Sequence, residues 1–296
     1  MSIIHSRRTG LYLLEYCRVL VKLERVVYVT ADDFHEYFWN IPIGNTSVLL
    51  LGNGTSITQA AARMLSADGV MVGFVGGGGT PLFLASQSEY RPTQYAQHWS
   101  QQWFNRASRL AIAKQFARYR CRFIGTAWSR LDVVTNARDD SATAIAGFLA
   151  AIDSASDNTV LMAAEGRFTK LLYKTLATAY GHEGFARQPG AKKITDKANS
   201  FLDHGNYLAY GLAAVALWVL GIPHSMPVSH GMTRRGALVF DVADLVKDGY
   251  ILPLAFIHAN QKSTDQDFRD RCTLESKRLG ILDIMVTQIK DSISDS

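Results

Sequence analysis

The pattern of apolar residues changes near Pro92, and this change constrains the fold more than any other feature of the chain. Before it, short β-branched and apolar runs predict strands at 19–22, 26–30, 47–51 and 70–75, and a helix at 57–68. After it, apolar residues recur at helical spacing in 93–122, 142–152, 160–180, 201–220, 240–256 and 264–294. We therefore predict an α+β chain with a small β-rich N-terminal domain over 1–82, a linker over 83–91 and a larger all-α C-terminal domain over 92–296.

The composition narrows the class of protein. No window approaches the ~20 uninterrupted apolar residues of a membrane span, and the first residues lack the apolar run of a signal peptide. We therefore expect a cytoplasmic protein with no membrane partner. The 3 cysteines, Cys17, Cys121 and Cys272, are far apart with no CxxC spacing, which indicates reduced thiols and argues against a disulfide framework or a zinc site.

The segment from His230 to Asp248 reads HGMTRRGALVFDVADLVKD and carries the strongest chemical signal. Asp241 and Asp244 are spaced i and i+3, so they share one face of the expected helix. The residues around them are mostly apolar, and carboxylates are costly to bury there unless they are paired, hydrogen-bonded or bound to a metal. The segment therefore suggests a ligand site.

A histidine with two aspartates suits a divalent cation, either Mg²⁺ or Mn²⁺, because Mn²⁺ also accepts imidazole. Glu165, in an otherwise apolar and basic helical stretch, is the best further oxygen donor. Taken singly, Glu165 is more simply a first-turn acid and His230 a structural loop histidine. Together with the two aspartates they favour a metal site, and Arg234 and Arg235 beside it suit a phosphate.

Basic residues are unevenly distributed along a chain of net charge +5. No acid occurs between Glu89 and Asp132, where Lys114, Arg118 and Arg122 recur at i, i+4 and i+8. This basic stripe is either a solvated face or a polyanion-binding surface, and we favour the second because solvated faces usually interleave both signs. Lys192 and Lys193 form a further basic loop that could contact a nucleic-acid backbone or could simply be mobile.

Several tryptophans lie close to this basic stripe in the sequence. Trp99, Trp103 and Trp128 could stack on bases, but their helical spacing favours a place in the core.

The order of these motifs resembles one known family. The matching pieces are LYLLEYCRVLV, YFWNIPIGNTSVLLLGNGTSITQAAARML, VGFVGGGGTPLF, EGRFTKLLYK, NSFLDHGNYLAYGLAA, LGIPHSMPVSHGMTRRGALVFDVADLVKD and DQDFRDRC, and they cover nearly the whole chain. The sequence is similar to the universal CRISPR adaptation integrase, in its type I-F (Ypest) branch. That family has an N-terminal β domain and a C-terminal α domain.

The resemblance implies a metal-dependent DNA endonuclease and integrase, which joins the 3′-hydroxyl ends of a short DNA fragment to the repeat array by transesterification. It places Glu165, His230 and Asp244 as ligands of Mg²⁺ or Mn²⁺, with Asp241 in support. The implied partners are double-stranded and branched DNA, a second copy in a homodimer, and a small ferredoxin-like adaptation protein, which in type I-F is fused to a helicase-nuclease.

Two other functions remain open from the sequence. A non-catalytic DNA-binding scaffold would keep the basic stripe and the dimer without needing a metal, and the intact set of acids and histidine argues against it. A nuclease that acts on branched DNA in repair would share the same chemistry.

Overall fold

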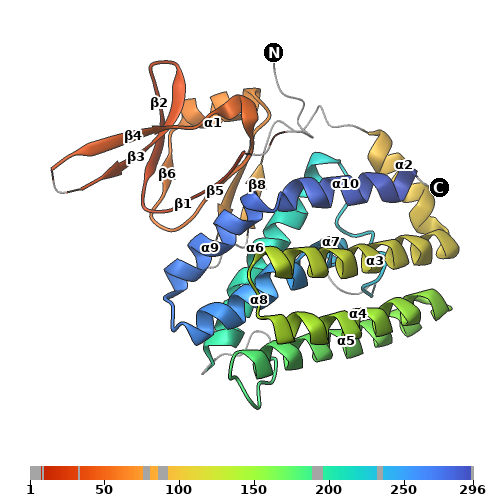
Figure 1. The fold of residues 1–296 in the computed structure, drawn as a ribbon. Helices are drawn as coiled ribbons and strands as arrows, with labels where there is room; N and C mark the ends of the chain where they lie inside the picture. The colour runs from red at the N-terminus through yellow and green to blue at the C-terminus, as the bar shows by residue number, and fades with distance from the viewer. Residues whose placement is uncertain are drawn as a thin grey trace. The chain divides into compact units, whose positions relative to one another are not determined.

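The computed structural model describes residue 8, residues 10–32, 34–75, 93–188, 196–231 and 236–294, and the backbone of residues 81–85. The chain divides into two compact units, Met1–Pro92 and Thr93–Ser296. The first unit is β-rich and the second is helical, so the α+β class is confirmed (Figure 1). The strand β8 runs from Pro81 to Ala85, so the part of the expected linker from 83 to 85 belongs to a sheet.

The N-terminal unit holds two four-stranded sheets. One has the order β1-β5-β7-β8, with β1 (Gly10–Leu14), β5 (Thr46–Leu51) and β7 (Met71–Val75) parallel and β8 antiparallel. The other has the order β4-β3-β2-β6, built from β2 (Arg18–Lys22), β3 (Arg25–Ala31), β4 (Glu36–Asn40) and β6 (Ser56–Ile57). The 3₁₀ turn η2 (Ile43–Asn45) precedes β5, and the helix α1 (Gln59–Ala67) follows β6.

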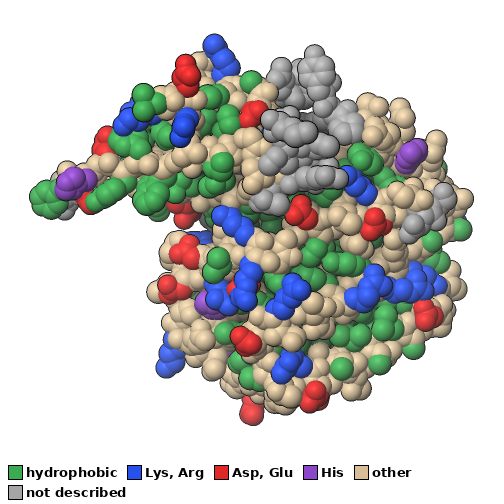
Figure 2. All heavy atoms as spheres, turned by 45° about the horizontal axis from the view of Figure 1, so that its top comes forward, with side chains coloured by type: hydrophobic (Ala, Val, Ile, Leu, Met, Phe, Trp, Pro, Cys, Tyr) green, Lys and Arg blue, Asp and Glu red, His purple; other side chains and the backbone are tan. Residues whose placement is uncertain are grey.

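The expected strands are confirmed, but β1, β4, β6 and β8 were not predicted, and β6 includes Ile57, which was expected to begin a helix. Every residue of β4 is exposed, so it has no alternation of buried and exposed positions to reveal it. Tyr37, Phe38 and Trp39 of β4 are 45%, 41% and 51% exposed. Hydrophobic side chains are visible on the surface of the β3–β4 hairpin in Figure 2. The core lies instead under α1, where Leu49, Leu51 and Leu65 are almost fully buried.

The described part of the C-terminal unit is a set of helices. In chain order they are α2 (Gln94–Phe104), α3 (Arg106–Arg130), α4 (Thr135–Ser154), α5 (Asn158–Ala179), α6 (Lys197–Val219), α7 (Ala237–Asp244), α8 (Lys247–Asn260), α9 (Asp265–Arg278) and α10 (Ile281–Ser294). Among the described residues, none of these helices has the length and apolar character that a membrane crossing requires.

Three of the expected long helices are interrupted. Asn105 separates α2 from α3 and caps α3, because its Oδ1 accepts hydrogen bonds from the backbone N–H groups of Ala107 and Ser108. A turn at 245–246 separates α7 from α8, and Gly280, with a φ of 67°, separates α9 from α10. Apolar spacing continues across each break, so periodicity alone predicts one helix where the structure has two.

The helix α6 forms the centre of this unit and packs against α7, α8, α9 and α10. The helix α3 packs against α4 and α8, and α4 packs along α5. Trp99 and Trp128 are 0% and 1% exposed, which confirms their expected place in the core, whereas Trp103 is only partly buried. Cys17, Cys121 and Cys272 are buried free thiols, also as expected.

Candidate functional site

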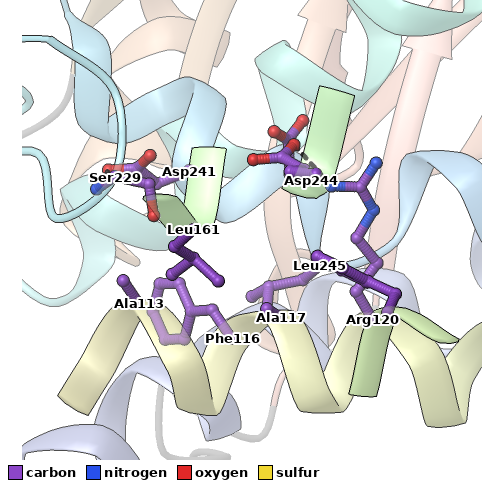
Figure 3. A pocket seen from close by; sticks show the side chains of 11 residues that line it. Ala113, Phe116, Ala117, Arg120, Leu161, Ser229, Asp241, Asp244 and Leu245 are labelled. Atoms are coloured by element: carbon purple, nitrogen blue, oxygen red, sulfur yellow. Dashed lines mark hydrogen bonds and ion pairs between the residues drawn. The ribbon is translucent and has the colours of Figure 1, made fainter. Parts of the chain in front are cut away.

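A small cavity of about 20 Å³ lies within the helical unit, at a point where α3, α5 and α7 meet. Such a volume is enough for about one water-sized particle. Glu165, Asp241 and Asp244 line it, so the structure brings together three of the residues predicted from the sequence. In Figure 3 the two aspartates lie on the upper side of the cavity, above the apolar side chains of Leu161 and residues of α3.

Asp241 holds the loop that precedes α7. Its Oδ2 accepts hydrogen bonds from the backbone N–H groups of Val228 at 2.7 Å and Ser229 at 3.2 Å. Its Oδ1 accepts one from the backbone N–H of His230 at 3.0 Å and lies 2.7 Å from His230 Nδ1. The Asp241 side chain is 0% exposed, so both of its oxygens are already fully used inside the protein.

The same loop is held from its other side by side chains that donate to its carbonyl groups. Trp99 Nε1 donates to the carbonyl oxygen of Met226 at 3.1 Å, and Trp103 Nε1 donates to that of Pro227 at 2.8 Å. Asn158, in the first turn of α5, donates from Nδ2 to the carbonyl oxygen of Val228. The position of His230 is therefore fixed by residues of α2, α5 and α7.

His230 has one nitrogen engaged and one directed at Asp244. An ionised carboxylate can only accept hydrogen bonds, so the contact with Asp241 places a proton on His230 Nδ1. Nε2 then lies 3.9 Å from Asp244 Oδ2 and carries the free lone pair of the neutral ring. Burial lowers the pKa of His230, but the hydrogen bond with Asp241 and the charges of Asp244, Asp241 and Glu165 outweigh it, so that this pKa is raised.

Glu165 contacts a buried cation, Arg120, and Asp244 contacts a partly buried one, Lys247. Glu165 Oε1 accepts a hydrogen bond from Arg120 Nη1 at 2.6 Å. Asp244 Oδ1 forms an ion pair with Lys247 Nζ. Burial raises the pKa of Asp244, but the charges of Lys247, Arg120 and His230 together hold it below its usual range. Asp244 is therefore a carboxylate at neutral pH.

The charges of the site do not cancel. Among the described residues, four carboxylates, those of Glu165, Asp241, Asp244 and Asp248, lie beside two permanent cations, Arg120 and Lys247. The formal charge of these six side chains is therefore −2, which matches one divalent cation.

The ligand chemistry also fits a divalent cation, because a glutamate, an aspartate and an imidazole nitrogen are donors that Mn²⁺ and Mg²⁺ sites use. In the part of the chain that the structure describes, no three such side chains converge as they do in a formed metal site. Instead, Arg120 contacts Oε1 of Glu165, and Lys247 contacts Oδ1 of Asp244.

The predicted basic stripe lies on α3 but is partly paired. Lys114 Nζ donates to the carbonyl oxygen of Asp153 at 3.2 Å, and Arg118 Nη2 lies 2.7 Å from Asp153 Oδ1. The guanidinium of Arg122 lies 5.6 Å from the ring centroid of Tyr119. The acid that the stripe lacks in sequence is thus supplied by α4. Arg234, Arg235, Lys192 and Lys193 lie outside the described residues.

Arg120, Lys247 and Asp248 are site residues that the sequence reasoning missed. Arg120 follows Ala113 and Phe116 at helical spacing on the buried face of α3, and a lone arginine on such a face is a usable signal. Asp248 lies seven residues after Asp241, on the same face if the helix were continuous.

Comparisons with known proteins agree with this fold. A family model described as CRISPR associated protein Cas1 matches residues 11–279. The CRISPR-associated endonuclease Cas1 of Pseudomonas aeruginosa is 49% identical, over 98% of this chain and 94% of its own length. The protein of the same name from Pectobacterium atrosepticum is 47% identical, over 99% of this chain and 94% of its own length.

Solved structures show the same fold at lower identity. The crystal structure of TtCas1 in complex with DNA has a TM-score of 0.68 at 22% identity, and the match covers 95% of this chain and 91% of that one. A partial Cas6-RT-Cas1–Cas2 complex has a TM-score of 0.64 at 14% identity, with 97% and 96% covered. The extent of the family match and the identity to the Pseudomonas protein decide the assignment: the chain belongs to the CRISPR-associated protein Cas1 family.

Proposed function

We propose that this protein is a metal-dependent DNA endonuclease and integrase of CRISPR adaptation, which inserts short foreign DNA fragments into the repeat array. In this reaction a 3′-hydroxyl oxygen attacks a backbone phosphorus, a new P–O bond forms, and the bond from that phosphorus to the original 3′ oxygen breaks. The main observation is a site whose described side chains carry a charge of −2, in which Glu165 and Asp244 line one small cavity and His230 Nε2 lies 3.9 Å from Asp244 Oδ2. Relatives about half identical in sequence are named endonucleases.

In this proposal Glu165, His230 and Asp244 hold Mg²⁺ or Mn²⁺. When bound, such a cation neutralises charge on a scissile phosphate and stabilises the leaving oxygen. The protein's own part is to hold these groups in place and to supply fixed positive charge. Asp241 fixes the His230 ring, and Lys247, which is 19% exposed, places an ammonium group at the rim of the site. Arg234 and Arg235 are proposed phosphate ligands.

The DNA backbone has two candidate contact surfaces on described helices. The stripe of Lys114, Arg118 and Arg122 remains one of them, although Asp153 occupies two of its cations. The other, which we call the α5 surface, consists of the exposed residues Arg167, Lys170 and Lys174.

Within the described residues, no hydrogen bond or ion pair involves the cations of the α5 surface. Lys174 follows Glu165 by nine residues, or about two and a half turns, so this surface is on the opposite side of α5 from the cavity. DNA bound there would be a different segment from the one at the reacting phosphate.

Charge reversal separates the two surfaces. We expect Lys170→Glu with Lys174→Glu, and separately Lys114→Glu with Arg118→Glu, to weaken DNA binding and to make the dependence of log Kd on log salt less steep. The measurement is fluorescence anisotropy with a labelled branched DNA at several salt concentrations. A double variant whose salt dependence equals that of the parent protein does not contact the DNA backbone through the reversed residues.

The proposed partners are double-stranded and branched DNA, a second copy of this chain, and a small ferredoxin-like adaptation protein fused to a helicase-nuclease. A solved structure of the same fold is a Cas1–Cas2 complex, which supports a protein partner for such a chain. Light scattering after size-exclusion chromatography tests the dimer. Co-elution with the fused partner tests the larger assembly. A protein that stays monomeric at micromolar concentration contradicts the proposed homodimer.

The central test is the Mn²⁺-dependent joining of a 3′-ended DNA fragment to a repeat-containing DNA, measured on sequencing gels. We expect Glu165→Gln and Asp244→Asn to abolish joining while leaving DNA binding largely intact. The matched control is Glu183→Gln, an exposed glutamate beyond the C-terminal end of α5. Full joining by Glu165→Gln would refute the assignment of the site.

The same assay separates the alternatives. A branched-DNA repair nuclease would cleave the branched substrate without any preference for repeat-containing DNA. A non-catalytic scaffold would bind DNA and neither cleave nor join it at any concentration of Mn²⁺ or Mg²⁺. We favour the integrase because three carboxylates line a common cavity and His230 lies beside one of them, an arrangement that a scaffold does not need.

A further inference from the structure

Arg120 lies at the centre of a buried network that joins α3, α5 and α8. Its guanidinium donates to Asp248 Oδ2 from Nε at 2.8 Å and also from Nη2. The remaining contacts are to α5: Nη1 donates to Glu165 Oε1 at 2.6 Å, and Nη2 donates to Thr169 Oγ1 at 2.9 Å. Arg120 is 3% exposed, so these contacts are made away from water.

The balance of charge shows that Glu165 is not required to neutralise Arg120. Asp248 has a side-chain exposure of 3% and already supplies one full negative charge against the guanidinium. The Glu165 side chain is 21% exposed and lines the cavity, so it is the partner that also faces outward. A buried ion pair that served stability alone would be complete with Asp248.

The geometry of the guanidinium determines the direction of the Glu165 carboxylate. The group is planar and its N–H directions are fixed, so contacts on the Nε and Nη2 side fix both N–H directions of Nη1, which donates to Glu165 Oε1. Thr169 is one turn after Glu165 on α5, and Arg120 therefore bridges positions i and i+4 of that helix. Among the described residues, Oε1 is the oxygen of Glu165 that has a hydrogen-bond partner, so Oε2 can serve a ligand.

Asp248 is itself fixed through its backbone. Trp128 Nε1 donates to the carbonyl oxygen of Asp248 at 2.9 Å. A Cβ atom at Gly249 would overlap the ring of Phe123, so the glycine allows α8 to approach α3 at this point. Asp248 therefore has a defined position from which to hold Arg120.

We propose that Arg120 is a positioning residue that directs Oε2 of Glu165 into the cation site, and that Asp248 anchors Arg120. The arrangement has the same form as the pair of Asp241 and His230, in which one atom of the ligand side chain is held so that the other is presented. The inference rests on the proposed function only in taking Glu165 as a cation ligand.

The test uses the full-length protein stripped with EDTA, and isothermal titration with Mn²⁺ alone. Substitution of a residue that orients a metal ligand weakens metal binding by about 10- to 100-fold, and we expect Asp248→Asn to raise the Mn²⁺ Kd by this factor. Thr169→Val, which removes one acceptor of Arg120, should raise it several-fold. Asp291→Asn on the exposed face of α10 is the matched control and should leave the Kd unchanged.

A second measurement separates positioning from mere structural support. A structural role would lower the Tm equally with EDTA and with Mn²⁺, whereas a positioning role also reduces the rise in Tm that Mn²⁺ produces. Folded Asp248→Asn protein with the parent's Mn²⁺ Kd would overturn the proposal. If that variant fails to fold, an unchanged Kd in Thr169→Val overturns it instead. Unchanged Mn²⁺ binding by Glu165→Gln would refute the cation site itself, which is a distinguishable result.

Discussion

Replacement of Asp241 by asparagine tests the site most sharply, because the two side chains have nearly the same shape. In the protein, Asp241 accepts from three backbone N–H groups and from the ring of His230, and it donates to none. In Asp241→Asn one oxygen becomes an NH₂ group, which is a donor. Whichever way the amide is placed, two existing donors then face another donor.

The two placements have different consequences for His230. If the amide oxygen stays with Val228 and Ser229, the NH₂ group faces His230 Nδ1. Nδ1 can accept a hydrogen bond from that group only in the neutral tautomer that carries its proton on Nε2. That proton occupies the lone pair that a cation needs. If the oxygen stays with His230, the two other backbone N–H groups lose their acceptor and the loop is released.

The magnitude follows from the bonds that are lost. Two hydrogen bonds to a charged acceptor contribute about 1.5–3 kcal/mol each, so the free energy of unfolding should fall by about 3–6 kcal/mol. For a helical unit of this size each kcal/mol corresponds to a Tm change of about 2–4 °C, which gives a loss of about 6–24 °C. Loss of the correct tautomer should weaken Mn²⁺ binding by about 10- to 100-fold.

Three measurements check this reasoning. Urea unfolding followed by circular dichroism gives the stability, titration calorimetry gives the Mn²⁺ Kd, and long-range ¹⁵N NMR of the ring gives the His230 tautomer. Asp139→Asn, on the exposed face of α4, is the matched control. If folded Asp241→Asn protein binds Mn²⁺ within twofold of the parent, Asp241 does not set the tautomer and the account given for His230 is wrong.

Three further predictions concern pH, packing and capping. Because the pKa of His230 is raised, its protonation stabilises the metal-free protein below about pH 6.5, and this stability is lost as pH rises through the folded pKa. Mn²⁺ competes with that proton, so its affinity should rise over the same range, and titrations at pH 6, 7 and 8 with equal affinities would contradict this. Gly249→Ala should lower the free energy of unfolding by about 1–3 kcal/mol by overpacking against Phe123, as urea unfolding would show. Asn105→Ala should lower it by about 1 kcal/mol through loss of the α3 cap, and no change would show that the cap is dispensable.

The sequence indicated the acids of the candidate site more clearly than it indicated the residues that hold them. The acids stood out because Asp241 and Asp244 lie in an apolar segment, where a carboxylate needs a reason to be buried. Arg120 did not stand out, because it lies between Arg118 and Arg122, two of the three cations that were interpreted as a surface stripe. Its burial depends on the contact with Asp248, which lies 128 residues later in the chain, and nothing local in the sequence records that contact.

The sequence also predicted some elements of the fold and missed others. Strands such as β2 and β5 were predicted because burial imposes a pattern on them, whereas β4 is exposed throughout and carries no such pattern. The turn at 245–246 was missed because apolar residues continue through it from α7 into α8. This turn matters for the site, since it places Asp244 at the end of one helix and Asp248 in the first turn of the next.

The excess negative charge of the site predicts that removal of one carboxylate charge raises the stability of the metal-free protein and weakens cation binding. Arg120 keeps Asp248 when Glu165 is replaced by glutamine, and the glutamine oxygen can still accept from Nη1, so Glu165→Gln removes a repulsive charge at little cost. In EDTA its Tm should therefore equal or exceed that of the parent, while the rise in Tm with Mn²⁺ should be lost. A large loss of stability in EDTA would mean that Glu165 is a structural partner of Arg120. The negative charge of Glu165 would then serve folding and not the binding of a cation.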